Sequence, residues 1–218
     1  MLRTIGLVLL LPFVAAALAV AQDGAREQPK KPYKVGWKIE DEIVLPDLTG
    51  TQHDLFGNYD DKVIVLVWWA MRDPAAQKYQ ERLQGLRKEF AAKDVLFFLV
   101  DSSHDELVAG IGDPLKKLRK FKKDEKIPFT ILIDRENKIA DDFGALTSNH
   151  AFVIGLDRII YYSGGIDDDP KAVRGNKRKN WLRDAIVAVR DGKRPKDMIT
   201  RPHGRKIKRA PKGAAKDR

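Results

Sequence analysis

Apolar residues along the chain gather in short runs and in helical stripes, and polar turns separate them. Strands buried on both faces are expected where β-branched and aromatic residues follow one another without interruption. The three such runs are residues 63–69, 95–100 and 129–133. Two hairpins are also expected, one over residues 43–56 and one over residues 151–162, where Leu156-Asp157 joins the two strands.

Three amphipathic helices are predicted between and after these strands. Two of them begin at an Asp-Pro pair, Asp73-Pro74 and Asp113-Pro114, because Asp is a favoured N-cap and Pro a favoured first helical residue. The third covers residues 179–190 and ends near Gly192. Two β-α-β units followed by β-β-α predict a three-layer α/β fold, with helices flanking a mixed central sheet.

The first residues have the pattern of a secretory signal. Arg3 supplies a positive charge, an apolar run follows, and Ala19-Val20-Ala21 matches a cleavage site. The run contains Pro12 and is short for a segment that spans a bilayer, so a cleaved signal over residues 1–21 is favoured over a membrane anchor. The protein is therefore expected to be exported, and to be periplasmic or extracellular after cleavage near Ala21.

Three further segments follow this signal. Residues 22–34 are polar and are expected to form a flexible linker, and residues 35–192 form the folded domain. Residues 193–218 contain eleven Lys or Arg and two Asp, whereas the segment 22–192 has no net charge. This basic tail has no apolar period and is expected to be mostly extended or disordered.

The tail is the one feature that points to an anionic partner. The candidate contacts with an anionic polymer or membrane surface are Lys206, Lys208, Arg209 and Lys212. No aromatic residue interleaves these cations, so base stacking with nucleic acid is not indicated and no sequence-specific nucleic-acid partner is expected. A tail that only increases solubility is an equal alternative.

The sequence contains no cysteine. Disulfide exchange and thiol peroxidation both need a thiolate, so the chain cannot supply the nucleophile for either reaction. No metal or cofactor is expected either. The four histidines, His53, His104, His150 and His203, lack metal-ligand spacing and are interpreted as solvated or incidental, although His150 retains a chance of ligand contact. The acidic run 167–169 lacks the glycine and glutamate of a calcium loop and is interpreted as a solvated turn.

Several motifs together indicate a family. Leu45–Gly50 and Lys62–Ala70 resemble the opening of the redoxin family, the alkyl hydroperoxide reductase and thiol-specific antioxidant branch of the thioredoxin superfamily. Asp73–Tyr79 resembles the Cys-Pro-x-Cys helix start of that family, and Gly164–Asp168 is similar to a signature of some exported redoxins. The resemblance extends over residues 35–208. It implies a thioredoxin-like fold and, for the family, thiol oxidoreductase or peroxidase-like antioxidant chemistry.

The departures from the resemblance fall at the family's working positions. Asp73 stands at the nucleophilic cysteine and Ala76 at the resolving one, while Asn149 stands at the cis-proline that faces the thiol. Arg205 replaces a cysteine that relatives often carry after a glycine. Asp73 is interpreted as a helix cap, and hydrolysis by its carboxylate is the weaker alternative, because no histidine is near in sequence. These replacements imply that redox activity has been lost.

The leading hypothesis is therefore a non-catalytic binding or accessory protein that works with another envelope protein. A ligand or partner would bind in the former substrate groove, at Met71, Arg72, Asp73, Ser148, Asn149 and His150. Two alternatives remain open. One is an oxidoreductase or antioxidant whose thiols come from a partner, and the other is polyanion anchoring by the tail.

Overall fold

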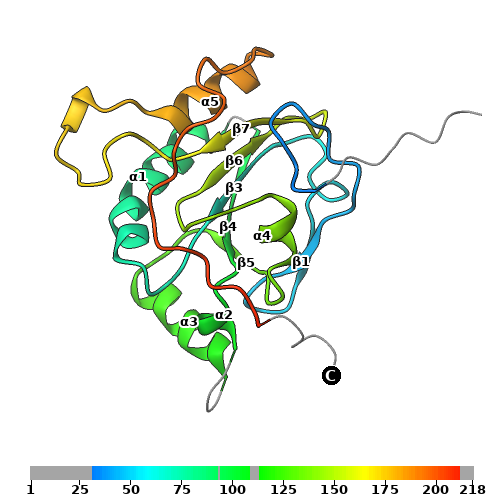
Figure 1. Ribbon diagram of the computed structural model, residues 1–218, viewed down its shortest axis with the longest axis vertical. Coiled ribbons are helices and arrows are strands. Elements are labelled where there is room, and N and C mark those ends of the chain that lie inside the picture. Colours follow the sequence, from blue (N-terminus) through cyan, green and yellow to red (C-terminus); the bar gives the residue numbers. More distant parts are fainter. Residues whose placement is uncertain (1–30, 93, 109–112, 212–218) are drawn as a thin grey trace, which may run out of the picture.

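The computed structural model describes residues 31–92, 94–108 and 113–211, which form the α/β architecture drawn in Figure 1. The expected signal peptide, most of the expected linker and the polyanion candidate Lys212 lie outside the described residues. None of the helices within the described ranges is long and apolar enough to cross a membrane.

A five-stranded sheet with the order β5-β4-β3-β6-β7 forms the centre of the molecule. Its strands are β3 (Val63–Trp68), β4 (Val95–Asp101), β5 (Thr130–Ile133), β6 (Ala151–Ile154) and β7 (Ile160–Gly164). The first three are parallel to one another, and β6 and β7 are added antiparallel. Every residue of β3 is buried, because layers cover both faces of the central strand, and this explains its uninterrupted apolar sequence. The predicted mixed sheet is confirmed.

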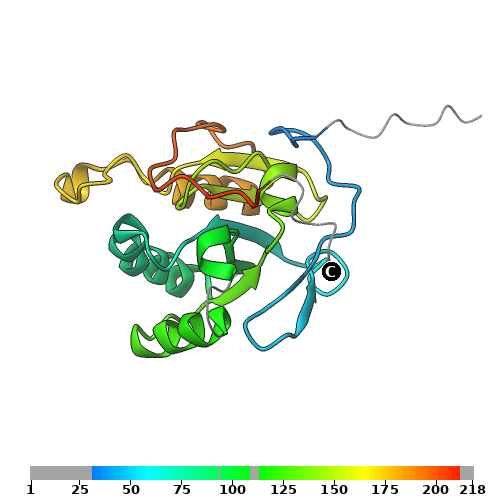
Figure 2. The same ribbon diagram turned by 60° about the horizontal axis from the view of Figure 1, so that its bottom comes forward.

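Three helices cover one face of the sheet. They are α1 (Pro74–Phe90), α3 (Pro114–Asp124) and α5 (Trp181–Arg190). The crossovers β3-α1-β4 and β4-α3-β5 run in the same direction across the sheet, so right-handed connections place both helices on the same side. Figure 2 shows the helices against the sheet from a second direction. On this face Tyr79, Leu118 and Ile186 belong to one apolar cluster with Val65 and Val67. The three predicted helices are confirmed.

The opposite face is covered by shorter elements. The antiparallel pair β1 (Val44–Pro46) and β2 (Gln52–Asp54) forms the predicted opening hairpin. The helix α4 (Lys138–Asp142) packs on the same side and begins after Asn137, which has a left-handed φ of 60°. The elements α2 (His104–Leu107), α4 and the 3-10 turn η1 (Gly175–Lys177) were not predicted, because three to five residues are too few to show a helical period.

Both Asp-Pro helix starts have the predicted capping geometry. Oδ1 of Asp73 accepts a hydrogen bond from the backbone N of Ala75 at 2.9 Å, and Oδ1 of Asp113 accepts one from Leu115 at 2.9 Å. At the other end of the domain, Gly192 follows α5 with a φ of 69°. This is the left-handed conformation that favours glycine after a helix.

The folded body begins before residue 35. Lys31 forms ion pairs with Asp41 at 2.9 Å and with Asp142 at 2.7 Å. Tyr33 is 5% exposed, and its ring packs edge-on against Phe143 with centroids 5.4 Å apart. The last residues of the segment expected as a linker therefore belong to the domain.

The acidic run 167–169 is not the solvated turn that the sequence indicated. Asp167 and Asp169 are each 2% exposed. Asp167 accepts hydrogen bonds from the guanidinium of Arg82 at 2.6 and 2.8 Å and from the hydroxyl of Tyr79 at 3.1 Å. The prediction failed because the cation that compensates this run lies 85 positions earlier in the chain.

The sequence indicated a mostly extended or disordered tail; its described part, residues 193–211, contains no helix and packs in part on the domain. We call residues 198–210 the C-terminal strap. It begins beside β7, where the backbone N of Ser163 donates to the carbonyl of Met198 at 3.0 Å and the N of Thr200 donates to the carbonyl of Ser163 at 3.1 Å. A Cβ on Gly165 would lie 2.7 Å from the carbonyl O of Arg201, so the strap approaches as closely as glycine allows.

Candidate functional site

Asp73 lies in the gap between the end of β3 and the start of α1, where an unpaired helix terminus favours an anion. Its side chain is buried, with the residue 4% exposed. Besides capping α1, the carboxylate accepts a short hydrogen bond from the hydroxyl of Ser148 and one of 3.2 Å from the backbone N of Arg205. Burial and these three donors together enclose the carboxylate within its own chain.

The C-terminal strap covers this position. It pairs antiparallel with the loop before β6: the N of Ser148 donates to the carbonyl of Arg205 at 2.9 Å, and the N of Ile207 donates to the carbonyl of Leu146 at 3.1 Å. Gly204 lies directly against Ser148, where a Cβ would collide with the Ser148 carbonyl. In Figure 1 the strap is the red segment that runs past α1 toward α2.

Three of the four replaced family positions come together here. Asp73 and Arg205 are in direct contact, and the side-chain amide of Asn149 donates to the carbonyl of His203 at 3.1 Å. Asn149 is fully buried with a φ of 58°, and its backbone N donates to the carbonyl of Trp68 at 2.6 Å. The fourth position, Ala76, is fully buried in the apolar cluster beneath α1.

Most of the residues expected to line the former substrate groove are buried. Asp73, Ser148, Asn149 and His150 are all buried, and Met71 is partly buried against the apolar cluster. Arg72 is the one exposed member of the six groove candidates. The groove is closed because the tail, which carries no local signal for folding, pairs with the loop that lines it.

Two acidic residues of α2 hold the strap electrostatically. Asp105 forms ion pairs with Arg205 at 2.8 Å and with Lys208 at 3.5 Å, and the guanidinium of Arg205 also lies 3.9 Å from Glu106. Burial alone would raise the pKa of Asp105, but the charges and hydrogen bonds of Arg205 and Lys208 together hold it below its usual value. The strap is therefore fixed by side chains as well as by backbone pairing.

Glu106 also shapes the turn in front of Asp73. Its carboxylate accepts hydrogen bonds from the backbone N of Met71 at 2.7 Å and of Arg72 at 2.9 Å. Burial raises the pKa of Glu106, and these two hydrogen bonds oppose the rise. Sequence reasoning missed this residue, because a single acidic residue in a short polar segment has no pattern that distinguishes it.

A comparison with known protein families identifies the family to which this arrangement of sheet and helix start belongs. The family model described as AhpC/TSA matches residues 35–163. The chain belongs to the AhpC/TSA family. This confirms the family over the matched segment, which contains Asp73 and Asn149, whereas the motif of residues 164–168 and Arg205 lie outside it. No curated protein matches the chain.

Solved structures share the fold of this AhpC/TSA protein. An uncharacterized conserved protein from Geobacillus kaustophilus superposes with a TM-score of 0.70 at 20% identity, covering 82% of this chain and 93% of its own. A hypothetical protein from Sinorhizobium meliloti 1021 gives 0.68 at 23% identity, with coverages of 83% and 97%. A protein provisionally designated thiol:disulfide interchange protein DsbE from Chlorobium tepidum gives 0.53 at 16%, with coverages of 72% and 98%. These likenesses support the thioredoxin-like fold.

His150 is buried beside the site of this AhpC/TSA protein. The expectation that this histidine is solvated was therefore wrong. It is 6% exposed, its Nδ1 accepts from the backbone N of Leu146 at 3.3 Å, and its Nε2 lies 3.0 Å from the hydroxyl of Ser163. Burial lowers the pKa of His150 to about 4. The ring is therefore neutral at neutral pH and links the strap-bearing loop to β7.

This pKa predicts acid sensitivity. The unfolded chain binds a proton at His150 near pH 6.5, whereas the folded chain does so only near pH 4. Stability should therefore fall as the pH decreases from 6.5 to 4, by at most about 1.4 kcal/mol per pH unit from this group. Burial also raises the pKa values of Glu106 and Asp134, which favours folding in acid. Urea midpoints across this range should show a flatter profile for His150→Gln, and an unchanged slope would contradict the assignment.

The polyanion candidates of the tail are largely paired within the molecule. Lys208 contacts Asp105, and Arg209 forms an ion pair with Asp141 at 2.7 Å and donates to the carbonyl of Ala145 at 2.7 Å. Lys206 is exposed. Much of the positive charge in the described part of the tail is thus neutralised by the domain.

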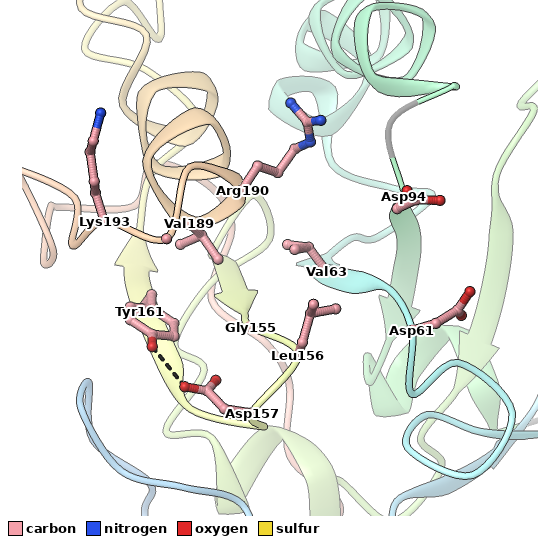
Figure 3. A pocket seen from close by; sticks show the side chains of 11 residues that line it. Asp61, Val63, Asp94, Gly155, Leu156, Asp157, Tyr161, Val189, Arg190 and Lys193 are labelled. Carbon is pink, nitrogen blue, oxygen red and sulfur yellow. Dashed lines mark hydrogen bonds between the residues drawn. The ribbon is translucent and has the colours of Figure 1, made fainter.

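A hollow lies at the other end of β3, away from Asp73. It has a volume of about 370 Å³ and lies between the start of β3, the β6–β7 turn and the end of α5. Figure 3 shows Tyr161 turned toward Asp157, to which its hydroxyl donates at 2.7 Å, with Lys193 on the same side of the hollow and Asp61 and Asp94 across from it. Within the described residues, no group of three His, Cys, Asp or Glu could hold a metal ion.

Proposed function

We propose that this AhpC/TSA protein is an exported, non-catalytic member of its family that acts as a binding or accessory partner of another envelope protein. The observation that carries the proposal is at the catalytic position itself. That position holds Asp73, whose carboxylate is bound to Ser148 and to the strap residue Arg205. The chain has no cysteine that could replace the lost nucleophile.

Hydrolysis by Asp73 receives no support from the geometry. A carboxylate that serves as a nucleophile or general base must reach the substrate, and usually a second group orients it. Asp73 is buried and hydrogen-bonded to a helix start and to the strap. The buried His150 does not orient Asp73, because its two ring nitrogens contact Leu146 and Ser163.

The export part of the proposal rests on the signal pattern of residues 1–21. Expression of the full chain in a bacterial host, followed by fractionation and N-terminal sequencing, tests it. We expect the mature chain to begin near residue 22 and to be recovered outside the cytoplasm. An uncleaved chain in the cytoplasm would contradict it.

A peroxidase and disulfide-reductase assay of the purified mature chain tests the loss of catalysis. We expect the native protein to remain at background, because no thiolate is available. An Asp73→Cys variant restores the nucleophile, and Asp113→Cys is the matched control, since it places a thiol at the other Asp-Pro helix start. Turnover by the native protein would contradict the proposal.

The variants used in this assay retain Asn149, although the resemblance places a proline of the family at this position. Proline has a φ near −65° and no N–H, whereas Asn149 has a φ of 58° and donates its N–H to Trp68. An Asn149→Pro substitution would therefore disturb the backbone beside the site. A gain of activity in Asp73→Cys, above the Asp113→Cys control, would show that the scaffold still supports thiol chemistry at the start of α1.

Site-directed crosslinking tests the accessory role. Arg72 is exposed at the edge of the closed site, so a photoreactive residue at position 72 should capture an envelope partner. Position 120 on the exposed side of α3 serves as the control. Absence of any crosslinked species specific to position 72 would count against binding at this site.

A further inference from the structure

We propose that the loop of residues 170–180 is a binding site for a polyanionic polysaccharide. This proposal is independent of the accessory role at Asp73. The loop contains five cations and no acidic residue: Lys171, Arg174, Lys177, Arg178 and Lys179. All of them except Arg178 are exposed. The net charge of the segment 22–192 is zero, so its charge balance does not reveal this local cluster of cations.

The loop projects from the body of the molecule. Figures 1 and 2 both show it as the yellow-to-orange segment that extends beyond α1, with η1 near its tip. A projecting cationic segment can contact an extended polymer without obstruction from the rest of the domain. Four of its five cations are exposed on this projecting segment.

The acidic run at the base of the loop holds it in a defined conformation. The carboxylate of Asp169 accepts from the backbone N of Val173 and of Arg174, both at 2.9 Å. Asp168 accepts from the backbone N of Lys179 at 2.8 Å and so joins the two ends of the loop. Ala172 has a left-handed φ of 57°, a conformation that persists in a non-glycine residue only where surrounding contacts impose it.

Charge is thus segregated within the loop, with acids at the buried base and cations on the exposed side. Arg174 is paired with Asp168 at 2.5 Å. None of the ion pairs found among the described residues involves Lys171, Lys177 or Lys179. This differs from the strap, where Arg205 and Arg209 are paired with acids.

The cleft beneath the loop is a poorer site for an anion. It has a volume of about 700 Å³ and lies between the loop, α1 and α5. Its arginines are already compensated, since Arg82 is paired with Asp167 and Arg183 with Glu89 at 2.6 Å. Besides these arginines the cleft is lined by Lys78 but also by Glu81 and Glu89, so its lining is of mixed charge, whereas the loop itself contains no acidic residue.

The side chains of the loop favour one class of polyanion. Residues 170–180 include no aromatic residue, so bases of a nucleic acid would find no stacking surface. Val173 is 77% exposed and is the only large apolar side chain of the loop, so a membrane would gain little from apolar insertion. A soluble polymer with repeating sulfate or carboxylate groups needs only the spaced cations.

Heparin serves as the sulfated polysaccharide probe for the test. The mature chain is compared with three variants, each of which exchanges three lysines for glutamine. The loop variant changes Lys171, Lys177 and Lys179, the helix control changes Lys116, Lys117 and Lys123 on α3, and the tail variant changes Lys206, Lys212 and Lys216. Equal changes in net charge separate the position of the cations from their number. Circular dichroism and urea midpoints confirm that each variant is folded.

We expect the loop variant to bind heparin at least about tenfold more weakly at low salt, because each cation at an anionic surface contributes severalfold to affinity. The helix and tail variants should change by less than about twofold. Equal losses in all three variants, or a loss confined to the tail variant, would overturn the proposal. Tighter binding of duplex DNA or anionic lipid vesicles than of heparin would overturn the choice of a polysaccharide.

Discussion

Replacement of Arg82 by alanine is expected to lower the free energy of unfolding by about 3–5 kcal/mol. The Arg82 side chain is 13% exposed, and that of Asp167, its partner at 2.6 Å, is 2% exposed. Alanine would remove the cation in direct contact with the buried Asp167 carboxylate. The nearest remaining cation, Arg178, lies 3.8 Å away with its side chain 34% exposed, and the hydroxyl of Tyr79 and the backbone N of Asp169 are neutral donors that cannot replace a charge. Urea unfolding of the purified mature chain measures the loss.

The matched control is Arg183→Ala. Arg183 pairs with Glu89 at 2.6 Å, but its side chain is 44% exposed and that of Glu89 is 31% exposed. Water screens such an exposed pair, so the free energy of unfolding should fall by at most about 1 kcal/mol. Equal effects of the two substitutions would contradict the conclusion that burial of Asp167 sets the difference.

The strands and the long helices could be predicted because their signals are local. The run 63–69 is apolar at every position, and a strand covered on both faces needs nothing else. The Asp-Pro pairs predicted both helix starts, since the cap and the first turn involve adjacent residues. Elements of this kind depend on neighbours in the sequence rather than on distant partners.

The course of the strap could not be predicted, because its partners are remote in sequence. Arg205 bonds to Asp73 across 132 positions and to Asp105 across 100 positions. Within the tail, cations without an apolar period indicate only a solvated segment. The backbone pairing of Ile207 with Leu146 leaves no trace in either segment, since each has an ordinary polar composition.

The candidate site was found by resemblance rather than by pattern. The family's motifs led to Asp73, Asn149 and Arg205, which the structure brings together around the start of α1. The same reasoning left the groove open and missed Glu106. Which acids are buried depends on tertiary contacts, so Glu106 at 5% exposure and a solvated glutamate look alike in sequence.

Asp73→Ala is expected to destabilise the protein by about 2–4 kcal/mol, more than the loss of a helix cap alone. The cap on Ala75 accounts for about 1 kcal/mol. The remainder comes from the hydroxyl of Ser148 and the backbone N of Arg205, which lose a charged acceptor in a buried setting. Asp113→Ala removes an equivalent cap from an exposed helix start. It should cost about 1 kcal/mol in the same urea titration.

Proteolysis distinguishes the two roles of Asp73. Trypsin cleaves after Lys and Arg, and the strap carries several of these, which backbone pairing to residues 146–148 protects in the native fold. If Asp73 anchors the strap, Asp73→Ala should accelerate cleavage within residues 201–209 while the sheet remains intact, and Asp113→Ala should not. Equal cleavage rates would reduce Asp73 to a helix cap. Faster cleavage in Asp73→Ala alone would show that Asp73 holds the chain's own C-terminal segment across the site.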